Sequence, residues 1–526
     1  MGLNRYRARS LSVGSSSKGC DREPSPKSSQ EPGVSGCGRR DGINVLLIMM
    51  DQLSFRAVGS AGNKQIQTPH LDRLAAEGVK FESAVCPAPI CSPSRSSITT
   101  GLYPHASGIN LNVDIHSEGL QAPLTDESHR FTEQILHEKG WYTFHRGIWH
   151  LGNKADLACY RDLPTGLDHS NEGFDYETFL EERLPAASVP RGDAEIFGRP
   201  VYMTPNCRRL HSRFLAWEGR TVQALSIIGR FAIPPALMSE ICLTDQAIQA
   251  IERNAGRKWM VTVSWSPPHP YWVAPEPYYS MYERSQMPLS DDGDNLPDWM
   301  RNSVGRRLRD WGGDEAAREY LAIYYGLVSM LDAEVGRLLA RIDQLGLTDR
   351  TLVIFTSDHG DSQGRFGVIG KGIPALYEEL VRVPLLMRLP GKIKAGTGIG
   401  QQVSLVDIMP TILDYAGADF PAGIHGQSLR PLIEGRTRGG HPFTFCERTV
   451  TRVEPKLIHR MVRCHEWKYC AYSNGQGQLF DLVNDPMERE NLFDDPSKRN
   501  VIRELHAELL HRGDEAVAGS FSADVA

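Results

Sequence analysis

The residues with the clearest chemical potential stand at positions 91–95, in a run that begins with Cys91 and ends with Arg95. Pro93 suits the first turn of a helix, because the N–H that proline lacks would have no helical partner there. Cys91 would then lie at the N-terminus of that helix, where free N–H groups and the positive end of the helix dipole favour an anion. Arg95 would follow about one turn later and could donate two hydrogen bonds to oxygens of that anion.

A second interpretation is that Cys86 and Cys91 are buried thiols or half of a zinc site. A zinc site needs a further closely spaced Cys or His pair, and the sequence offers none that completes the set. The run at 91–95, the segment Thr68–Gly78 before it and the segment Ile98–His105 after it together resemble the sulfatase family, within the alkaline-phosphatase superfamily. The resemblance covers about residues 44–492.

The resemblance implies a particular chemistry for Cys91. Sulfatases oxidise the cysteine of this motif to formylglycine, and the oxidation requires a formylglycine-generating enzyme as partner. A serine or threonine nucleophile would leave a stable ester after attacking sulfur, whereas the hydrate of an aldehyde carries two hydroxyls. One hydroxyl attacks, and loss of the proton from the other expels sulfate without attack by water. We therefore expect a formylglycine at position 91.

Other polar residues with chemical potential follow short apolar runs at residues 45–50, 259–265 and 352–355. Runs without alternation are typical of parallel strands buried on both faces. In sheets of such strands, ligands bind outside the carboxyl ends. Residues about 300 positions apart in the sequence should therefore meet at one edge of the sheet. The residues that follow these runs are Asp51, His269, Asp358 and His359.

Helical patterns lie between the predicted strands. Thr68 could cap a helix that ends near Gly78, and residues 324–345 form a longer amphipathic pattern. Strands that alternate with helices predict an α/β fold with a doubly wound, mostly parallel sheet. After about residue 440 the sequence becomes β-rich, and the resemblance implies a small antiparallel sheet with a closing helix.

The predicted domain organisation has three parts. Residues 1–41 are rich in Ser, Gly, Pro and Arg and read as a disordered tail, residues 42–439 as the catalytic α/β domain, and residues 440–526 as the C-terminal subdomain. Residues 184–239 and 284–317 lack strong periodicity, so we expect insertions around the pocket there.

The resemblance also implies one divalent cation. Many sulfatases carry a second aspartate where this chain has Gln52, and an asparagine where it has His359. The combination here looks closer to the choline-sulfatase and phosphonate monoester hydrolase branch. Oxygen ligands suit Ca²⁺, Mg²⁺ or Mn²⁺, and an imidazole favours Mn²⁺, so we expect Ca²⁺ or Mn²⁺. Without the resemblance, the Asp-His-Gly triplet at residues 358–360 would be as compatible with a solvent-exposed turn as with a cation site. The expected ligands are Asp51, Gln52, Cys91, Asp358 and His359.

Three further residues are expected to contact the anion or move protons. His269 and Lys371 match family positions at the sulfate group, and either could protonate the departing alcohol. His150 stands in a segment where the family often has a lysine two residues earlier, but this chain has Ile148. The absence of that lysine weakens the expectation that the enzyme strictly prefers sulfate esters. Arg146 would share the face of Ile148 on a strand and is a candidate replacement.

The composition of the 526-residue chain limits its partners. A net charge of −6 gives no reason to expect nucleic acid or an anionic membrane. Ten cysteines in so long a chain are not a disulfide framework. No apolar stretch approaches the ~18 residues of a spanning helix. We expect a cytoplasmic protein, with an organellar transit peptide as the alternative, and the sequence leaves open whether it forms a homo-oligomer.

The sequence thus predicts a sulfuric ester hydrolase, similar to arylsulfatases, that acts on a small-molecule ester. A carboxylate such as that of Asp358 would take the proton of the attacking hydroxyl, and His150 or a neighbour would take the last proton. The same groups could hydrolyse a phosphonate monoester or a phosphodiester instead, an alternative that Gln52, His359 and Ile148 favour. A non-catalytic member of the family is a third alternative, and the intact motif at 91–95 counts against it.

Overall fold

The computed structural model describes residues 42–113, 121–125, 129–152, 176–185, 188, 190–196, 199–208, 212, 227–289, 307–371, 376–450 and 457–511. The predicted tail, residues 1–41, lies outside the described residues, as do parts of both predicted insertions.

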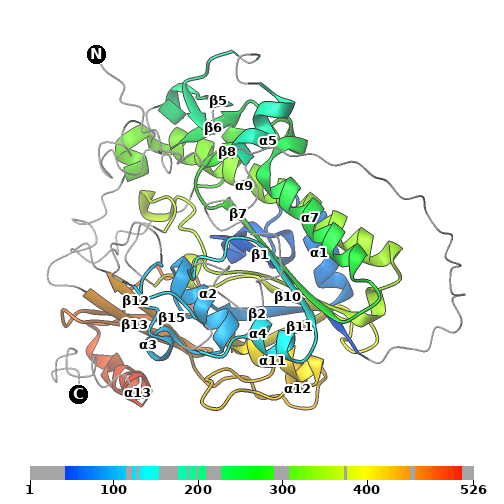
Figure 1. The fold of residues 1–526 in the computed structure, drawn as a ribbon. Helices are drawn as coiled ribbons and strands as arrows, with labels where there is room; N and C mark the ends of the chain where they lie inside the picture. The colour runs from blue at the N-terminus through cyan, green and yellow to red at the C-terminus, as the bar shows by residue number, and fades with distance from the viewer. Residues whose placement is uncertain are drawn as a thin grey trace, which may run out of the picture. The chain divides into compact units, whose positions relative to one another are not determined.

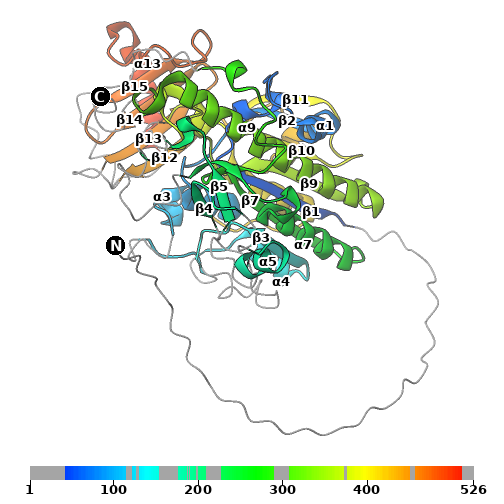
Figure 2. The same ribbon diagram turned by 90° about the horizontal axis from the view of Figure 1, so that it is seen from above.

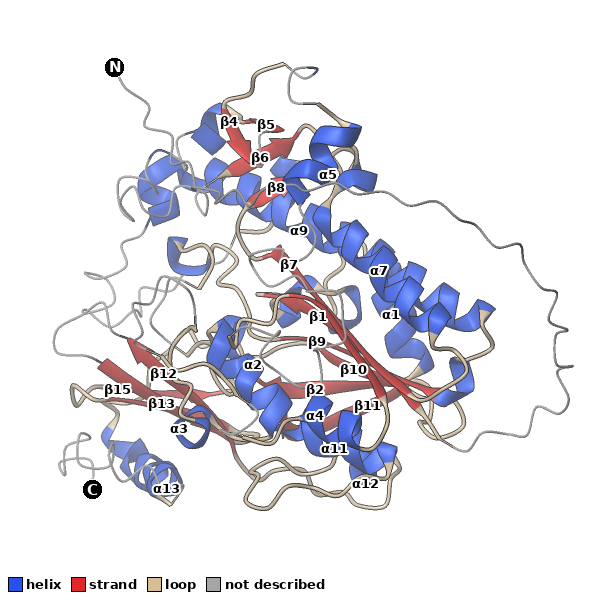
Figure 3. Ribbon diagram, in the orientation of Figure 1, coloured by secondary structure: helices blue, strands red, loops and turns tan. Residues whose placement is uncertain are grey.

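A seven-stranded sheet forms the centre of the fold, in the order β11-β2-β10-β9-β1-β7-β3 (Figure 3). Only β10 runs antiparallel to its neighbours β9 and β2, while every other pairing in this sheet is parallel. The prediction of a mostly parallel sheet is therefore confirmed. The three apolar runs became the central strands β1, β7 and β9. The strands span β1 Asn44–Asp51, β2 Val79–Val85, β3 Tyr142–Gly147, β7 Trp259–Pro268, β9 Thr351–Ser357, β10 Leu385–Arg388 and β11 Thr397–Ser404.

Helices cover both faces of this sheet (Figure 1). Leu46, Ile48 and Met50 of β1 pack into one apolar cluster with α1, α7 and α9, and the alternate residues Val45, Leu47 and Met49 pack into a second with α2, α4 and α11. This division is why β1 is apolar without alternation. The helices of the first group are α1 Pro69–Glu77, α7 Ser239–Arg253 and α9 Arg307–Gln344, and those of the second are α2 Cys91–Thr100, α4 Thr132–Glu138 and α11 Ile408–Ala416.

A separate antiparallel sheet follows in the C-terminal part, in the order β12-β13-β14-β15 (Figure 2). Helix α13 (Arg499–Leu510) packs on it through Ile502 and Leu505, which confirms the predicted small sheet with its helix. Glu378 of α10 (Glu378–Val381) ties this sheet to the rest, because its carboxylate accepts hydrogen bonds from Arg463 at 3.0 and 3.1 Å. The strands are β12 Thr444–Val450, β13 Leu457–Arg463, β14 Trp467–Tyr472 and β15 Gly477–Asp481.

A third sheet, β4-β5-β6-β8, lies largely within residues 184–239, where the sequence predicted only an aperiodic insertion. Its strands have three or four residues each, too few for an alternating pattern to be recognised. They span β4 Ala194–Ile196, β5 Arg199–Tyr202, β6 Ile228–Phe231 and β8 Trp272–Ala274. The short helices are α3 Pro104–Ser107, α5 Tyr176–Arg183 and α12 Arg430–Ile433. Among the described helices, none has the length and apolar character needed to cross a membrane.

Candidate active site

Two neighbouring strands and one helix bring the central residues together. Strand β1 ends at Asp51, and β9 ends at Ser357, opposite Met50 in the parallel register. Cys91 is the first residue of α2, as predicted, and every residue of that helix is buried. The thiol Sγ of Cys91 lies 3.7 Å from Oδ1 of Asp51 and 3.3 Å from Nε2 of His359. Residues 268 positions apart in the sequence therefore share one small buried space.

Arg95 holds the two carboxylates of this space. Its Nε donates to Asp358 at 2.9 Å and its Nη2 to Asp51 at 3.0 Å. Nη1 donates to the carbonyl of Ile148 at 2.8 Å and to the hydroxyl of Ser264 at 2.7 Å. Four of the five guanidinium N–H groups are thus directed at the protein. These contacts make Arg95 a positioning residue for the two carboxylates, while its hydrogen bonds to the anion stay a prediction.

We expect Arg95→Lys to destabilise the cation-free protein by about 3 kcal/mol or more, because one ammonium cannot bind both carboxylates and breaking a buried ion pair is costly. Thermal melting in a chelator would measure the loss as a lower Tm. Arg130→Lys is the matched control, since Arg130 and Glu138 form an exposed pair that should contribute at most about 1 kcal/mol. Equal Tm values for the two variants would contradict this role of Arg95.

The orientation of His359 leaves one ring nitrogen available to a ligand. Its Nδ1 lies 2.9 Å from the carbonyl oxygen of Gly360, which can only accept, so Nδ1 carries the proton and Nε2 presents a lone pair. Burial lowers the pKa of His359, which favours the neutral ring. Nε2 faces Cys91 and lies 3.3 Å from Nζ of Lys371. An imidazole held in this way is typical of a metal ligand.

Lys371 brings a positive charge to Cys91. Its Nζ donates to Sγ at 2.7 Å, and although burial would lower the pKa of Lys371, the interaction with Cys91 and the charge of Asp51 raise it, so the ammonium stays charged. The pKa of the Cys91 thiol is itself raised by burial and by the charge of Asp51. Reactive cysteines have lowered pKa values, so the unmodified thiol is a poor nucleophile here.

Gln52 continues from β1 with a backbone φ of 68°, which is unusual for a residue with a side chain. Its N–H donates to Asp358 at 3.1 Å and its Nε2 donates to Asp361 at 2.6 Å. The other polar atom of the amide, Oε1, is buried and has no hydrogen-bond partner among the described residues. Burial raises the pKa of Asp361 to about 6, although hydrogen bonds from Gln363, Tyr320 and Gln52 act in the opposite direction.

The donor atoms fit a divalent cation. One ligand atom each from Asp51, Cys91, Asp358 and His359 lies within 4.8 Å of the others, and all four residues are buried. The Oε1 of Gln52, the residue that follows Asp51, is a buried polar oxygen without a partner among the described residues, which makes it a candidate for a fifth ligand atom. Two carboxylates, an amide oxygen and an imidazole are compatible with both Ca²⁺ and Mn²⁺.

The remaining predicted residues surround this centre at different distances. The backbone of His150 lies against the start of α2, where its carbonyl accepts from Ser92 at 2.5 Å. His269 is half-buried and follows Pro268, the register partner of Asp51, and its Nδ1 lies 2.9 Å from the carbonyl oxygen of Pro270. Ile148 is buried, and its carbonyl accepts from Arg95. The backbones of His150 and Ile148 therefore contact the start of α2 and Arg95, respectively.

Arg146 contacts α7 and a neighbouring aromatic ring. Its Nε donates to Gln246 of α7 at 2.7 Å and its guanidinium lies over the ring of Phe144. Strand β3 ends at Gly147, whose φ of 87° changes the direction of the chain before Ile148. The two side chains therefore do not follow the alternation of one strand, which is the reason that the predicted shared face is wrong.

Arg448 is a residue that the sequence analysis missed. It lies on β12 of the C-terminal sheet and its Nη2 donates to the carbonyl of Lys371 at 3.1 Å. Burial lowers the pKa of Arg448 to about 10. The C-terminal sheet therefore contributes a cation next to the lysine of the site, and no local pattern in the sequence signals this contact.

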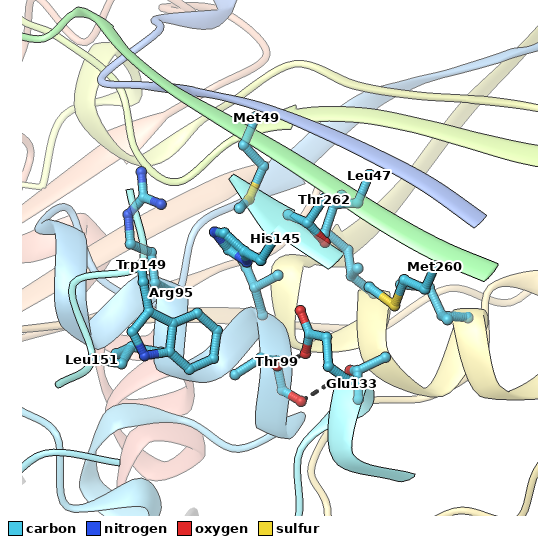
Figure 4. A pocket seen from close by; sticks show the side chains of 14 residues that line it. Leu47, Met49, Arg95, Thr99, Glu133, His145, Trp149, Leu151, Met260 and Thr262 are labelled. Atoms are coloured by element: carbon cyan, nitrogen blue, oxygen red, sulfur yellow. Dashed lines mark hydrogen bonds between the residues drawn. The ribbon is translucent and has the colours of Figure 1, made fainter. Parts of the chain in front are cut away.

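A small cavity of about 20 Å³ has Arg95 among its lining residues (Figure 4). Glu133 and His145 line it, and Thr99 donates a hydrogen bond to Glu133 at 2.7 Å. Cys91 and Lys371 are not among its lining residues. Its volume suits one ordered water and is too small for a substrate, so this cavity is not the substrate pocket.

Comparisons with known proteins agree with this geometry. The Sulfatase family matches residues 43–418, and the family described as N-sulphoglucosamine sulphohydrolase, C-terminal, matches residues 364–515. A steryl-sulfatase of Rattus norvegicus is 30% identical, with 90% of this chain and 88% of that protein covered. An ulvan-active sulfatase of Formosa agariphila is 28% identical, with 89% of this chain and 80% of that protein covered.

Among solved structures, the phosphonate monoester hydrolase of Agrobacterium radiobacter has a TM-score of 0.72 at 24% identity, with 89% of this chain and 95% of that chain covered. At this identity the likeness is one of fold, and it agrees with the α/β architecture and the second sheet. The family match extends over most of the chain and includes the buried cluster around Cys91. The chain therefore belongs to the sulfatase family and is a hydrolase of that family's class, which acts on sulfate esters.

Proposed function

We propose that this enzyme hydrolyses small-molecule sulfate esters with a formylglycine made from Cys91 and one divalent cation held by Asp51, Gln52, Asp358 and His359. The observation that carries the proposal is the position of Sγ, at the N-terminus of α2, within 3.7 Å of Asp51, 3.3 Å of His359 and 2.7 Å of Lys371. The thiol marks where the oxygens of the modified residue would stand.

Each group of the site has a separate task in this proposal. The hydrated aldehyde supplies a hydroxyl for attack and a second hydroxyl for release of sulfate, and the cation supplies Lewis acidity. Lys371 places its charge where negative charge develops on the transferred group, and Lys371 or His269 donates a proton to the departing oxygen. Asp358 accepts the proton of the attacking hydroxyl, and Arg95 keeps Asp51 and Asp358 in place. His150 or a neighbouring group accepts the last proton.

The second candidate function is hydrolysis of a phosphonate monoester or phosphodiester at the same centre. The observation that favours it is Ile148, a neutral residue at the position where many sulfatases carry a cation. A non-catalytic role is disfavoured because four donor residues lie within 4.8 Å of one another and Lys371 contacts one of them, Cys91. The partnership with a formylglycine-generating enzyme and the cytoplasmic location stay predictions.

The experiment that separates these functions is a turnover panel on fully converted protein. It compares an aryl sulfate, choline sulfate, a phosphonate monoester and a phosphodiester at one pH. We expect the highest kcat/KM with a sulfate ester. Turnover of only the phosphorus esters would establish the second candidate, and no turnover of any substrate by converted, cation-loaded protein would contradict both.

Ile148→Lys should raise kcat/KM for the sulfate ester relative to the phosphodiester by about tenfold, equivalent to ~1.4 kcal/mol of transition-state binding. A lysine would add charge at the anion, and Ile148 is buried without belonging to the apolar clusters of the described core. Ile148→Met is the neutral control and should leave the ratio unchanged. A Tm equal to that of the parent together with an unchanged ratio would show that residue 148 does not contact the anion.

A further inference from the structure

We propose that Asp361 is a positioning residue that fixes the carboxamide of Gln52, so that Oε1 of Gln52 faces the cation. This pairing also explains why residue 52 is a glutamine where many sulfatases have a second aspartate. The inference depends on the proposed function only in requiring that the site binds a cation. Asp361 stands two residues after His359 and has no role in the proposed function.

The hydrogen bonds around Asp361 determine which way the amide of Gln52 points. A carboxylate only accepts, so the group 2.6 Å from Oδ2 of Asp361 must be the amide NH₂ of Gln52 and not its oxygen. The second oxygen, Oδ1, accepts from the hydroxyl of Tyr320 at 2.8 Å and from the N–H of Gln363 at 2.7 Å. Both oxygens of Asp361 are occupied by donors, so the carboxylate cannot turn away from Gln52.

The backbone of Gln52 is held as firmly as its side chain. The hydroxyl of Tyr324 donates to the carbonyl of Gln52 at 2.7 Å and accepts from the N–H of Ser54 at 3.1 Å. The N–H of Gln52 donates to Asp358, a predicted cation ligand. These bonds maintain a φ of 68°, a conformation that persists only where the surroundings enforce it. Three fixed points thus leave Oε1 as the one polar atom of the residue that has no hydrogen bond among the described residues.

A second carboxylate at position 52 would conflict with this arrangement. A glutamate, which has the length of glutamine, would face the buried carboxylate of Asp361 at hydrogen-bond distance with no donor between them, and two such groups cannot both be ionised at low cost. An aspartate is one methylene shorter and would leave Asp361 without the donor that Gln52 supplies. A glutamine avoids the conflict because one end of its amide donates to Asp361 and the other end offers an oxygen to the cation. We infer that residues 52 and 361 act as a matched pair.

The test exchanges donor and acceptor in the hydrogen bond between the side chains of residues 52 and 361. In Asp361→Asn, the asparagine oxygen would keep Tyr320 and Gln363, so its NH₂ would face the NH₂ of Gln52 and turn that amide round. In the double variant Gln52→Glu/Asp361→Asn, the same NH₂ would donate to the new carboxylate, which leaves one carboxylate oxygen for the cation. Asp361→Ala removes the charge of Asp361 without placing a donor against Gln52.

Calorimetric titration of the chelator-treated proteins with MnCl₂ and with CaCl₂ measures the affinity directly and needs no turnover. We expect Asp361→Asn to weaken binding by roughly 10- to 100-fold, the usual effect of losing a partner of a metal ligand. Asp361→Ala should weaken it less, and the double variant should bind about as tightly as the parent.

Equal losses in Asp361→Asn and Asp361→Ala would mean that only the charge of Asp361 matters, and that result would overturn the inference while leaving the cation site intact. Failure of the double variant to bind better than Asp361→Asn would overturn it as well. A parent that binds neither cation would contradict both this inference and the cation of the proposed function. Tyr320→Phe keeps all charges but removes one hydrogen bond to Asp361, so it should weaken cation binding about threefold. This variant replaces Asp361→Asn in the test if Asp361→Asn does not fold. Unchanged affinity in a folded Tyr320→Phe would then contradict the inference.

Discussion

Cys91→Ala is expected to lower kcat for an aryl sulfate by about 10⁴-fold or more, the scale of loss seen when a covalent nucleophile is removed. The substitution removes the sulfur that allows Cβ of residue 91 to be oxidised to the aldehyde, while Arg95 and the two carboxylates keep their contacts. Steady-state kinetics on protein produced together with a formylglycine-generating enzyme would measure the loss.

Two further variants make this result specific. Cys464→Ala changes a half-buried cysteine of the C-terminal part and should keep kcat within about twofold of the parent, the range of an ordinary surface change. Cys91→Ser supplies one hydroxyl without the second, so it should accumulate a sulfated serine, which mass spectrometry would detect, and should not turn over. Full activity in Cys91→Ala would disprove covalent catalysis by residue 91.

Asp358→Asn should remove most of the bound cation and lower kcat by about 10³-fold, since one charged ligand is lost from a buried site. The Asp358 carboxylate accepts hydrogen bonds from three donors, which are Nε of Arg95, the N–H of Gln52 and the N–H of His359. An asparagine has a single accepting oxygen, so it cannot satisfy these donors and a cation together. Elemental analysis after dialysis would give the cation content per chain.

Asp332→Asn is the control for a buried aspartate outside the site. Asp332 accepts the N–H groups of His70 and Leu71 at the start of α1, and its replacement should leave the cation content unchanged. If Asp358→Asn retained as much cation as Asp332→Asn, the cation would have to bind elsewhere.

The centre of the fold and of the site could be predicted because both depend on strong local patterns. The unbroken apolar runs of β1, β7 and β9 can only be buried strands or core helices, and their polar ends must then meet at one sheet edge. Pro93 and the small residues around it likewise predict the start of α2, because proline is favoured in the first turn of a helix. Asp51, Cys91, Asp358 and His359 consequently lie together as expected.

The sequence could not predict the contacts that depend on tertiary packing. Arg95 has the same five donors whether it binds an anion or two carboxylates, and only the structure shows which partners are near. Arg448 and Tyr320 reach the site from β12 and α9, with no motif around either of them. Arg146 was misplaced because a single glycine, Gly147, ends the strand and breaks the alternation on which the prediction relied.

The most direct test of the central claim is the dependence of turnover on the conversion of residue 91. Protein would be produced with graded amounts of formylglycine-generating enzyme, and peptide mass spectrometry would give the converted fraction of each sample. With the cation supplied in excess, kcat per chain for an aryl sulfate should rise in proportion to the converted fraction and extrapolate to zero for the unmodified cysteine. Equal turnover in unconverted and fully converted samples would contradict the formylglycine mechanism.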